Sequence, residues 1–274
     1  MVVEDKIALY RGNPIYYKVR GVEHLSASKP ARALVLLHGF LETQAMWHPL
    51  ADFLNEEKCC IISIDLPGFG LTPTWGYVQS MEQMAMAVSA VCVQEQIEWV
   101  DLVGHSMGGY VALAFAELYV NQVQSLCLLH STALPDSEDR KLIRDKVIAT
   151  IKENPAVYTR LFFDGLFKPD NMPRFQSEIA QMRKAIEGVT PKAMVNALLG
   201  MRNRKDRLPF LKSAPFKVGF VIGRHDVSVP CESLLYQVEQ VTGCEYLLLE
   251  HSAHMGQLEQ QHEAFSFLKK FFST

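Results

Sequence analysis

Residues 99–118 of the chain read WVDLVGHSMGGYVALAFAEL, and this stretch decides the fold. It opens with an apolar run, Trp99–Val103, of the length of a buried strand. Residues 104–108, Gly-His-Ser-Met-Gly, then match the pattern G-x-S-x-G, and a helical spacing of apolar residues follows. A serine between a strand and a helix lies on a tight turn at the helix N-terminus, where developing negative charge is stabilised. The stretch predicts an α/β fold with Ser106 as a candidate nucleophile.

Short apolar runs alternate with helical patterns on both sides of this stretch. Their near-continuous apolarity is typical of parallel strands that are covered on both faces. One helix is predicted from Met81, with Ser80 and Gln83 as a capping box, and the last from about Met255 to Phe272. Alternating strands and helices indicate a mostly parallel sheet with right-handed crossovers. The predicted strands are Ala33–Leu37, Cys59–Ile64, Trp99–Val103, Val123–Leu129, Lys217–Ile222 and Tyr246–Leu249.

The N-terminal segments Lys6–Tyr10 and Pro14–Arg20 flank a turn sequence and predict an antiparallel hairpin at one edge of the sheet. The stretch Leu134–Ser213 is helical in pattern and contains no clear buried strand. We therefore predict a core of residues 1–133 and 214–274 with an inserted helical lid, residues 134–213.

Composition bounds the class of protein. The 274 residues are 49% hydrophobic and 21% charged, which is ordinary for a globular protein. A net charge of -3 gives no reason to expect nucleic acid as a partner. No apolar run reaches the ~20 residues of a membrane helix, and the first residues lack the apolar region of a secretory signal. The six cysteines form no CxxC pair, so we expect reduced thiols, no metal site and a cytoplasmic protein. The oligomeric state stays open.

A serine hydroxyl needs a base, and nine histidines are available. His254 follows the strand Tyr246–Leu249 across a short loop, and loops at the carboxyl ends of parallel strands are where ligand sites gather. His251 is the rival in the same loop. We predict His254 as the general base.

The acid that orients the base is predicted as Asp226, just beyond the strand Lys217–Ile222. The order Ser, Asp, His along the chain is the one expected for this architecture. Asp136 also follows a strand and stays an alternative, whereas Asp65 opens a structured turn.

The tetrahedral intermediate of acyl transfer needs donors for its oxyanion. We expect the backbone N–H of Met107, next to the nucleophile, and that of Phe40 in the loop after Ala33–Leu37. Candidate pocket residues, each of which could equally be structural, are His38, Trp47, His105 and His130.

Together these motifs resemble the α/β-hydrolase superfamily, and the closest resemblance is to its small, lidded, carboxylesterase-like members. The resemblance implies an eight-stranded, mostly parallel sheet, a cap after the sixth strand and acyl-enzyme chemistry without a cofactor. The nucleophile position holds Ser106 rather than an aspartate, so the resemblance is not to the dehalogenase or epoxide-hydrolase branches. The matching blocks are His38-Gly39-Phe40 with Trp47, residues 65–70, residues 104–109, residues 223–226, and His254 with Glu259.

The resemblance implies hydrolysis of a carboxylic ester or thioester. The same triad also serves carbon–carbon hydrolysis, lyase, acyl-transfer or peroxide chemistry, and a ligand-binding receptor with little turnover is a third reading. Residues 134–213 carry sixteen Lys and Arg against ten Asp and Glu, on a chain whose net charge is -3. Such asymmetry can steer an anionic substrate or an acidic carrier, with the run Arg140, Lys141 and Arg144 as first contact. The alternative is that these charges coat solvent-facing helix sides.

Overall fold

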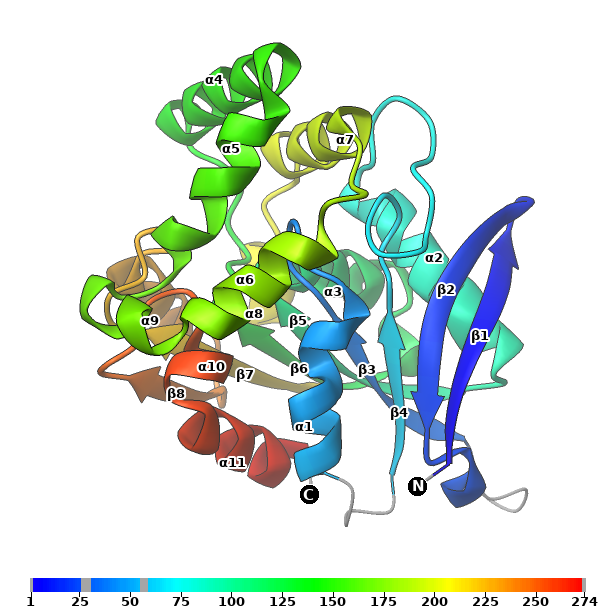
Figure 1. Ribbon diagram of the computed structural model, residues 1–274. Coiled ribbons are helices and arrows are strands. Elements are labelled where there is room, and N and C mark those ends of the chain that lie inside the picture. Colours follow the sequence, from blue (N-terminus) through cyan, green and yellow to red (C-terminus); the bar gives the residue numbers. More distant parts are fainter. Residues whose placement is uncertain (1, 26–30, 55–58, 273–274) are drawn as a thin grey trace.

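A computed structural model describes residues 2–25, 31–54 and 59–272. One eight-stranded sheet runs in the order β1-β2-β4-β3-β5-β6-β7-β8 (Figure 1). β2 pairs antiparallel with β1 and β4, and the pairs from β4 to β8 are parallel. The sheet is therefore mixed, with the predicted antiparallel hairpin at one edge. The strands are β1 (Val3–Tyr10), β2 (Asn13–Arg20), β3 (Arg32–Leu37), β4 (Cys60–Ile64), β5 (Trp99–His105), β6 (Val123–Leu129), β7 (Lys217–Gly223) and β8 (Glu245–Leu249).

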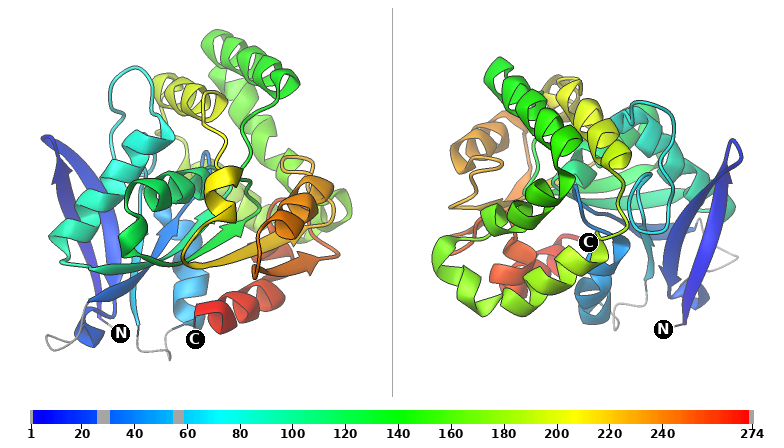
Figure 2. Two further views of the ribbon diagram at one scale, coloured as in Figure 1. Left: turned by 180° about the vertical axis from the view of Figure 1, so that it is seen from behind. Right: turned by 45° about the horizontal axis from the view of Figure 1, so that its top comes forward.

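Helices cover both faces of the sheet, as the apolar strands require (Figure 2). One face packs against α2 (Met81–Gln94), α3 (Met107–Leu118) and α9 (Cys231–Gln240). The other packs against α1 (His48–Phe53) and α11 (Gln261–Phe272). Because side chains alternate along a strand, each central strand contributes to two separate apolar cores.

The predicted capping box is present at the start of α2. The Ser80 hydroxyl accepts the N–H of Gln83, and the Gln83 side chain accepts the N–H of Ser80. Together these bonds satisfy two of the donors that the first turn of a helix leaves free.

The single C-terminal helix predicted from about Met255 is wrong in detail. It is divided into α10 (Gly256–Glu259) and α11, because Gln260 leaves the helical conformation at φ -134° and ψ 58°. The Gln260 side chain accepts the N–H of His251, and the Glu259 carboxylate accepts that of Ala253. The break therefore ties the start of the helices to the loop that carries His254.

Residues 134–213 lie between β6 and β7 in the chain and contain helices and no strand. In Figure 1, α4, α5 and α7 lie above the sheet, while α6 lies in front of it. The helices are α4 (Glu138–Glu153), α5 (Pro155–Phe162), α6 (Gln176–Ala185), α7 (Pro191–Arg202) and α8 (Leu208–Lys212), with 3₁₀ turns at Phe163–Leu166 and Pro169–Arg174. Among the described residues, no helix has both the length and the apolarity needed to cross a membrane.

Candidate active site

Ser106 lies on the turn between β5 and α3, as predicted. Its backbone has φ 51° and ψ -114°, a conformation that a residue with a Cβ rarely adopts. The chain can bend so sharply only because glycines flank the turn. A Cβ on Gly104 would lie 2.4 Å from the Gly108 oxygen, and a Cβ on Gly108 would lie 2.1 Å from the Leu37 oxygen. Strain of this kind is typical of a functional turn that presents one side chain.

His254 and Asp226 form a buried hydrogen bond. The distance from His254 Nδ1 to Asp226 Oδ2 is 2.7 Å. The other carboxylate oxygen, Oδ1, accepts the N–H groups of Ser228 at 2.8 Å and Val229 at 2.9 Å. Burial raises the pKa of Asp226, but the charge of His254, its hydrogen bond and the nearby His130 together outweigh burial, and the pKa falls well below its usual range. Asp226 is therefore a carboxylate with both oxygens held in place.

The rival residues lie elsewhere. His251 is exposed, and its backbone oxygen and N–H group bond to the side chains of Asn171 and Gln260. Asp136 is buried between Arg144 and Arg204, which form ion pairs with it. Asp65 accepts the N–H groups of Gln44 and Leu71, as expected for a structured turn.

His130 lies beside the same carboxylate. Its Nε2 accepts the N–H of Gly256 at 3.1 Å, so the proton of the neutral ring is on Nδ1, which lies 3.6 Å from Asp226 Oδ2. Complete burial lowers the pKa of His130 to about 4, although Asp226 opposes this shift. His130, Asp226 and His254 are the three residues in the described ranges whose potential metal-ligand atoms lie within 4.8 Å of one another. Hydrogen bonds already engage most of these atoms.

The structure places the two predicted oxyanion donors on the segments around Ser106 as follows. Met107 is the first residue of α3, where a helix has no internal acceptor for its N–H groups. Phe40 lines the same cavity as Ser106. The loop before Phe40 is fixed by His38, whose Nδ1 lies 2.7 Å from the Gly39 oxygen and whose Nε2 accepts the N–H of Leu66. Burial lowers the pKa of His38, so this histidine is a neutral structural residue.

The other candidate pocket residues do not line this cavity. Trp47 is buried in the core formed with α1 and α11, on the other face of the sheet, where burial of its large ring removes apolar surface from water. His105 and His130 are buried beneath the site, with ring centroids 5.0 Å and 5.8 Å from that of His254. All three are therefore packed in the interior rather than exposed to a substrate.

The cavity at Ser106 has a volume of about 170 Å³ and lies between the core and residues 134–213. His254 and Val229 line it from the core, while aromatic and aliphatic side chains form most of the remaining wall. The sequence does not predict most of these wall residues, because no local pattern shows that α4, α5 and α7 turn them toward Ser106. The lining residues are Phe40, Ser106, Tyr110, Arg140, Ile143, Arg144, Val147, Tyr158, Phe162, Leu166, Leu198, Met201, Ser228, Val229 and His254.

A sequence model of the alpha/beta hydrolase fold matches residues 32–261, which include the turn at Ser106, Asp226 and His254. The chain belongs to the alpha/beta hydrolase fold family. The curated relatives and solved structures of this family include esterases and lipases, which supports a hydrolase.

Two curated relatives illustrate the range of this family. The acetyltransferase component of the acetoin cleaving system of Pseudomonas putida is 27% identical over 255 residues. That alignment covers 86% of this chain but 63% of the relative, less than two thirds of its length. The pimeloyl-[acyl-carrier protein] methyl ester esterase of Aeromonas hydrophila is 27% identical over 244 residues, covering 87% of this chain and 94% of that one.

Among solved structures, a thermophilic esterase from Thermogutta terrifontis superposes with a TM-score of 0.86. Its sequence is 24% identical, and the match covers 98% of this chain and 97% of that one. At this level of identity the likeness shows the fold alone, which is the alpha/beta hydrolase fold.

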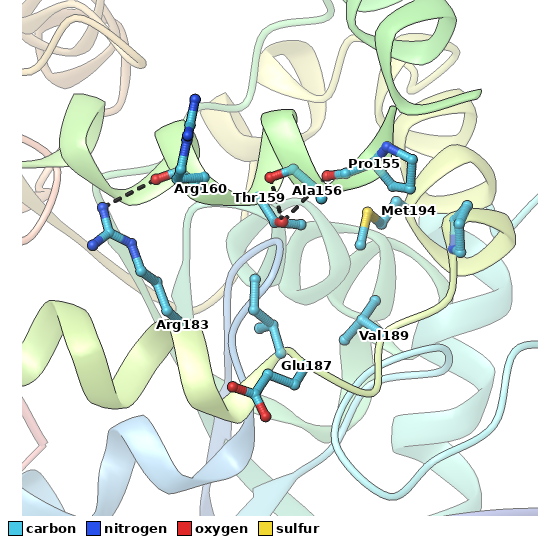
Figure 3. Close-up of a pocket in the computed structure, with 10 residues that line it drawn as sticks. Pro155, Ala156, Thr159, Arg160, Arg183, Glu187, Val189 and Met194 are labelled. Carbon is cyan, nitrogen blue, oxygen red and sulfur yellow. Dashed lines mark hydrogen bonds between the residues drawn. The ribbon is translucent and has the colours of Figure 1, made fainter. Parts of the chain in front are cut away.

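A second hollow, about 390 Å³ in volume, lies between α5 and the segment that joins α6 to α7 (Figure 3). Arg183 donates to the backbone oxygen of Arg160 across it, and Glu187 lines the same hollow. Ser106, Asp226 and His254 are not among its lining residues. The hollow is therefore separate from the candidate catalytic group.

Proposed function

We propose that this family member is a serine hydrolase that cleaves a carboxylic ester or thioester of a small acyl substrate through an acyl-enzyme on Ser106. One observation carries the proposal. Ser106, on its strained turn, lines the same cavity as His254, and Nδ1 of His254 is hydrogen-bonded to the buried Asp226. Nucleophile, base and orienting acid thus follow in the order of the family pattern.

In this mechanism His254 Nε2 takes the proton of the Ser106 hydroxyl as the oxygen attacks the carbonyl carbon. The Phe40 and Met107 amides donate to the resulting oxyanion. His254 then gives its proton to the leaving alcohol or thiol as the bond to it breaks, leaving an acyl-serine. A water molecule, deprotonated by His254, attacks the acyl carbon, and the carboxylic acid leaves as Ser106 regains its proton.

Residues 134–213 act in this proposal as a lid. They supply one wall of the cavity through α4, α5 and α7, including Ile143, Tyr158 and Leu198. An apolar wall opposite the nucleophile excludes water and favours an acyl group over a charged one at that position. The volume of about 170 Å³ favours a short acyl chain.

Arg140 gives the proposal its substrate class. It lines the cavity from α4 and donates to the backbone oxygen of Ser228, and it forms no ion pair with any carboxylate in the described part of the chain. Arg144 lines the same cavity but is bonded to Asp136. We propose that the available N–H groups of Arg140 bind an anionic group on the substrate, either a terminal carboxylate or the acidic part of a carrier. The Aeromonas hydrophila relative acts, by its name, on a carrier-linked ester.

Labelling with a fluorophosphonate probe tests the nucleophile. The wild-type protein should react at Ser106, and Ser106→Ala should lose both labelling and ester turnover, by on the order of 10⁶ in kcat, with unchanged circular dichroism. Retained turnover of more than a few per cent in Ser106→Ala would contradict the assignment. A panel of esters, thioesters and diketones then separates ester hydrolysis from carbon–carbon chemistry, and labelling without turnover would favour a receptor.

A further inference from the structure

A buried pair, Glu42 and His105, lies behind the candidate catalytic residues. Glu42 Oε2 is 2.7 Å from His105 Nδ1, and the two side chains are 3% and 1% exposed. The same Oε2 atom accepts the N–H of Gly39 at 2.6 Å. On the other side of the ring, His105 Nε2 lies 3.0 Å from the backbone oxygen of His254.

These contacts determine the charge of the ring. A carboxylate oxygen and a carbonyl oxygen are both acceptors, so each ring nitrogen of His105 must carry a hydrogen. His105 is therefore an imidazolium and Glu42 a carboxylate. The neighbouring rings differ: His38 and His130 each accept a backbone N–H through Nε2, which requires their neutral form.

Electrostatics agree with this assignment. Burial lowers the pKa of His105, but the charge of Glu42 and the bonds to Glu42 and the His254 carbonyl outweigh burial and raise it. Burial raises the pKa of Glu42, and His105 together with the Gly39 N–H more than offsets it.

We propose that the Glu42–His105 ion pair positions the catalytic groups of this site, a role that rests on the proposed function. Three segments of the chain meet at the pair. Gly39 precedes the Phe40 donor, His105 precedes the Ser106 nucleophile, and the His254 carbonyl belongs to the base itself. A single charged ring thus sets the spacing between the oxyanion loop, the nucleophile and the base.

Glu42→Gln tests the pair without changing its shape. In the wild-type protein Glu42 Oε2 accepts two hydrogens, one from the Gly39 N–H and one from His105. An amide nitrogen there could not accept from Gly39, and an amide oxygen would leave a neutral His105 with one bare nitrogen facing an acceptor. At least one of the three links is therefore lost. Misplacement on the scale of 1 Å costs up to about 100-fold in rate, so we expect kcat to fall about 10- to 100-fold while KM stays within about twofold.

Asp101→Asn is the matched control. Like Glu42, Asp101 is a buried carboxylate. It lies on β5, is bonded to Arg32 and Ser125, and is near the end of the strand away from Ser106. Asp101→Asn should lower the unfolding temperature and leave kcat unchanged. The fluorophosphonate labelling rate of each variant reports on Ser106 separately from hydrolysis of the acyl-enzyme.

Nitrogen-15 NMR of histidine-labelled wild-type protein tests the charge without any variant. The signals of His105 are those that disappear in the spectrum of His105→Gln. At pH 8 these signals should show that both ring nitrogens of His105 carry a hydrogen. A neutral His105, an unchanged kcat in Glu42→Gln, or an equal loss of kcat in Asp101→Asn would each overturn the proposal. If the wild-type protein is not labelled by the fluorophosphonate, the proposed function fails instead. The two failures can be told apart because the NMR measurement of His105 does not depend on turnover.

Discussion

His254 Nδ1 lies 2.7 Å from Asp226 Oδ2, and the two side chains are 5% and 0% exposed. Because the second Asp226 oxygen is held by the N–H groups of Ser228 and Val229, the carboxylate cannot turn away from the ring. The bond keeps the hydrogen on Nδ1 and leaves Nε2 as the proton acceptor.

Asp226→Asn should preserve the shape of the site and lower kcat by on the order of 10⁴. The amide can donate to Nδ1, which favours the tautomer whose Nε2 already carries a hydrogen and cannot act as a base. Steady-state kinetics with a nitrophenyl ester measures the loss, and circular dichroism verifies the fold. A near-normal Asp226→Asn enzyme would mean that another acid orients the base.

His254→Ala and His251→Ala form a matched pair from the same loop. The first removes the proposed base, whereas the second removes an exposed side chain for which the structure gives no contact with Asp226. Turnover should vanish in the first and persist in the second. The opposite result would show that the base was assigned to the wrong histidine.

Much of the fold was predictable because it depends on local patterns. Continuous apolar runs predicted the strands, and the glycines around Ser106 predicted the turn that presents it. The role of Glu42 was not predictable, since a charged residue three positions after Gly39 looks solvated until His105 from another strand is placed beside it. Trp47 was expected near the pocket because of its place in a motif, yet its side chain points to the other face of the sheet.

The charge of residues 134–213 shows the same limit. The excess of basic residues is evident from the sequence, but the partners of each one are not. Asp136, the alternative acid, instead forms ion pairs with Arg144 and Arg204. Arg140, four residues before Arg144, faces the cavity with no carboxylate partner among the described residues.

His130 should make folding stability depend on pH between about 6.5 and 4. Its pKa is lowered from 6.5 to about 4, so in this window the unfolded chain binds a proton that the folded protein does not. The free energy of unfolding therefore keeps its full value with respect to His130 above pH 6.5. It falls as pH drops toward 4, by up to about 3 kcal/mol. Urea unfolding at intervals across this range measures the slope. Burial also lowers the pKa values of His38 and His48 below 6.5, so these two histidines add to the slope in the same range. The lowered pKa values of Asp226 and Glu42 act at more acidic pH, and the raised pKa of His105 acts at higher pH.

His130→Asn separates this effect from the rest of the chain. Asparagine tolerates the positive φ of 48° at this position and carries no charge, so the variant should be less stable but flatter in pH dependence. His262→Asn, at an exposed position, should keep the wild-type slope. An unchanged slope in His130→Asn would assign the pH dependence to another group.

Activity should not require a metal ion. His254 Nδ1 and Asp226 Oδ2 are bonded to each other, and His130 Nε2 is bonded to Gly256, which leaves no set of three free ligand atoms in this group. Dialysis against a chelator should leave ester turnover unchanged. Loss of turnover that one added divalent ion restores would contradict this expectation.

Arg140→Gln should reveal whether the cavity selects anionic substrates. A charged hydrogen bond contributes about 1.5–3 kcal/mol, so its loss should raise KM about tenfold or more for esters with a terminal carboxylate and leave matched neutral esters unchanged. Arg140→Lys keeps the charge but not the paired N–H groups, and should recover only part of the affinity.

Lys146→Gln removes the same charge from an exposed position on α4 that does not line the cavity. If charge acts only by long-range steering, Arg140→Gln and Lys146→Gln will weaken kcat/KM alike, and both effects will vanish at high salt. If Arg140 binds the anion directly, its variant alone will raise KM, and the difference will persist in salt. Equal KM changes for anionic and neutral esters would leave Arg140 as a structural residue that holds Ser228.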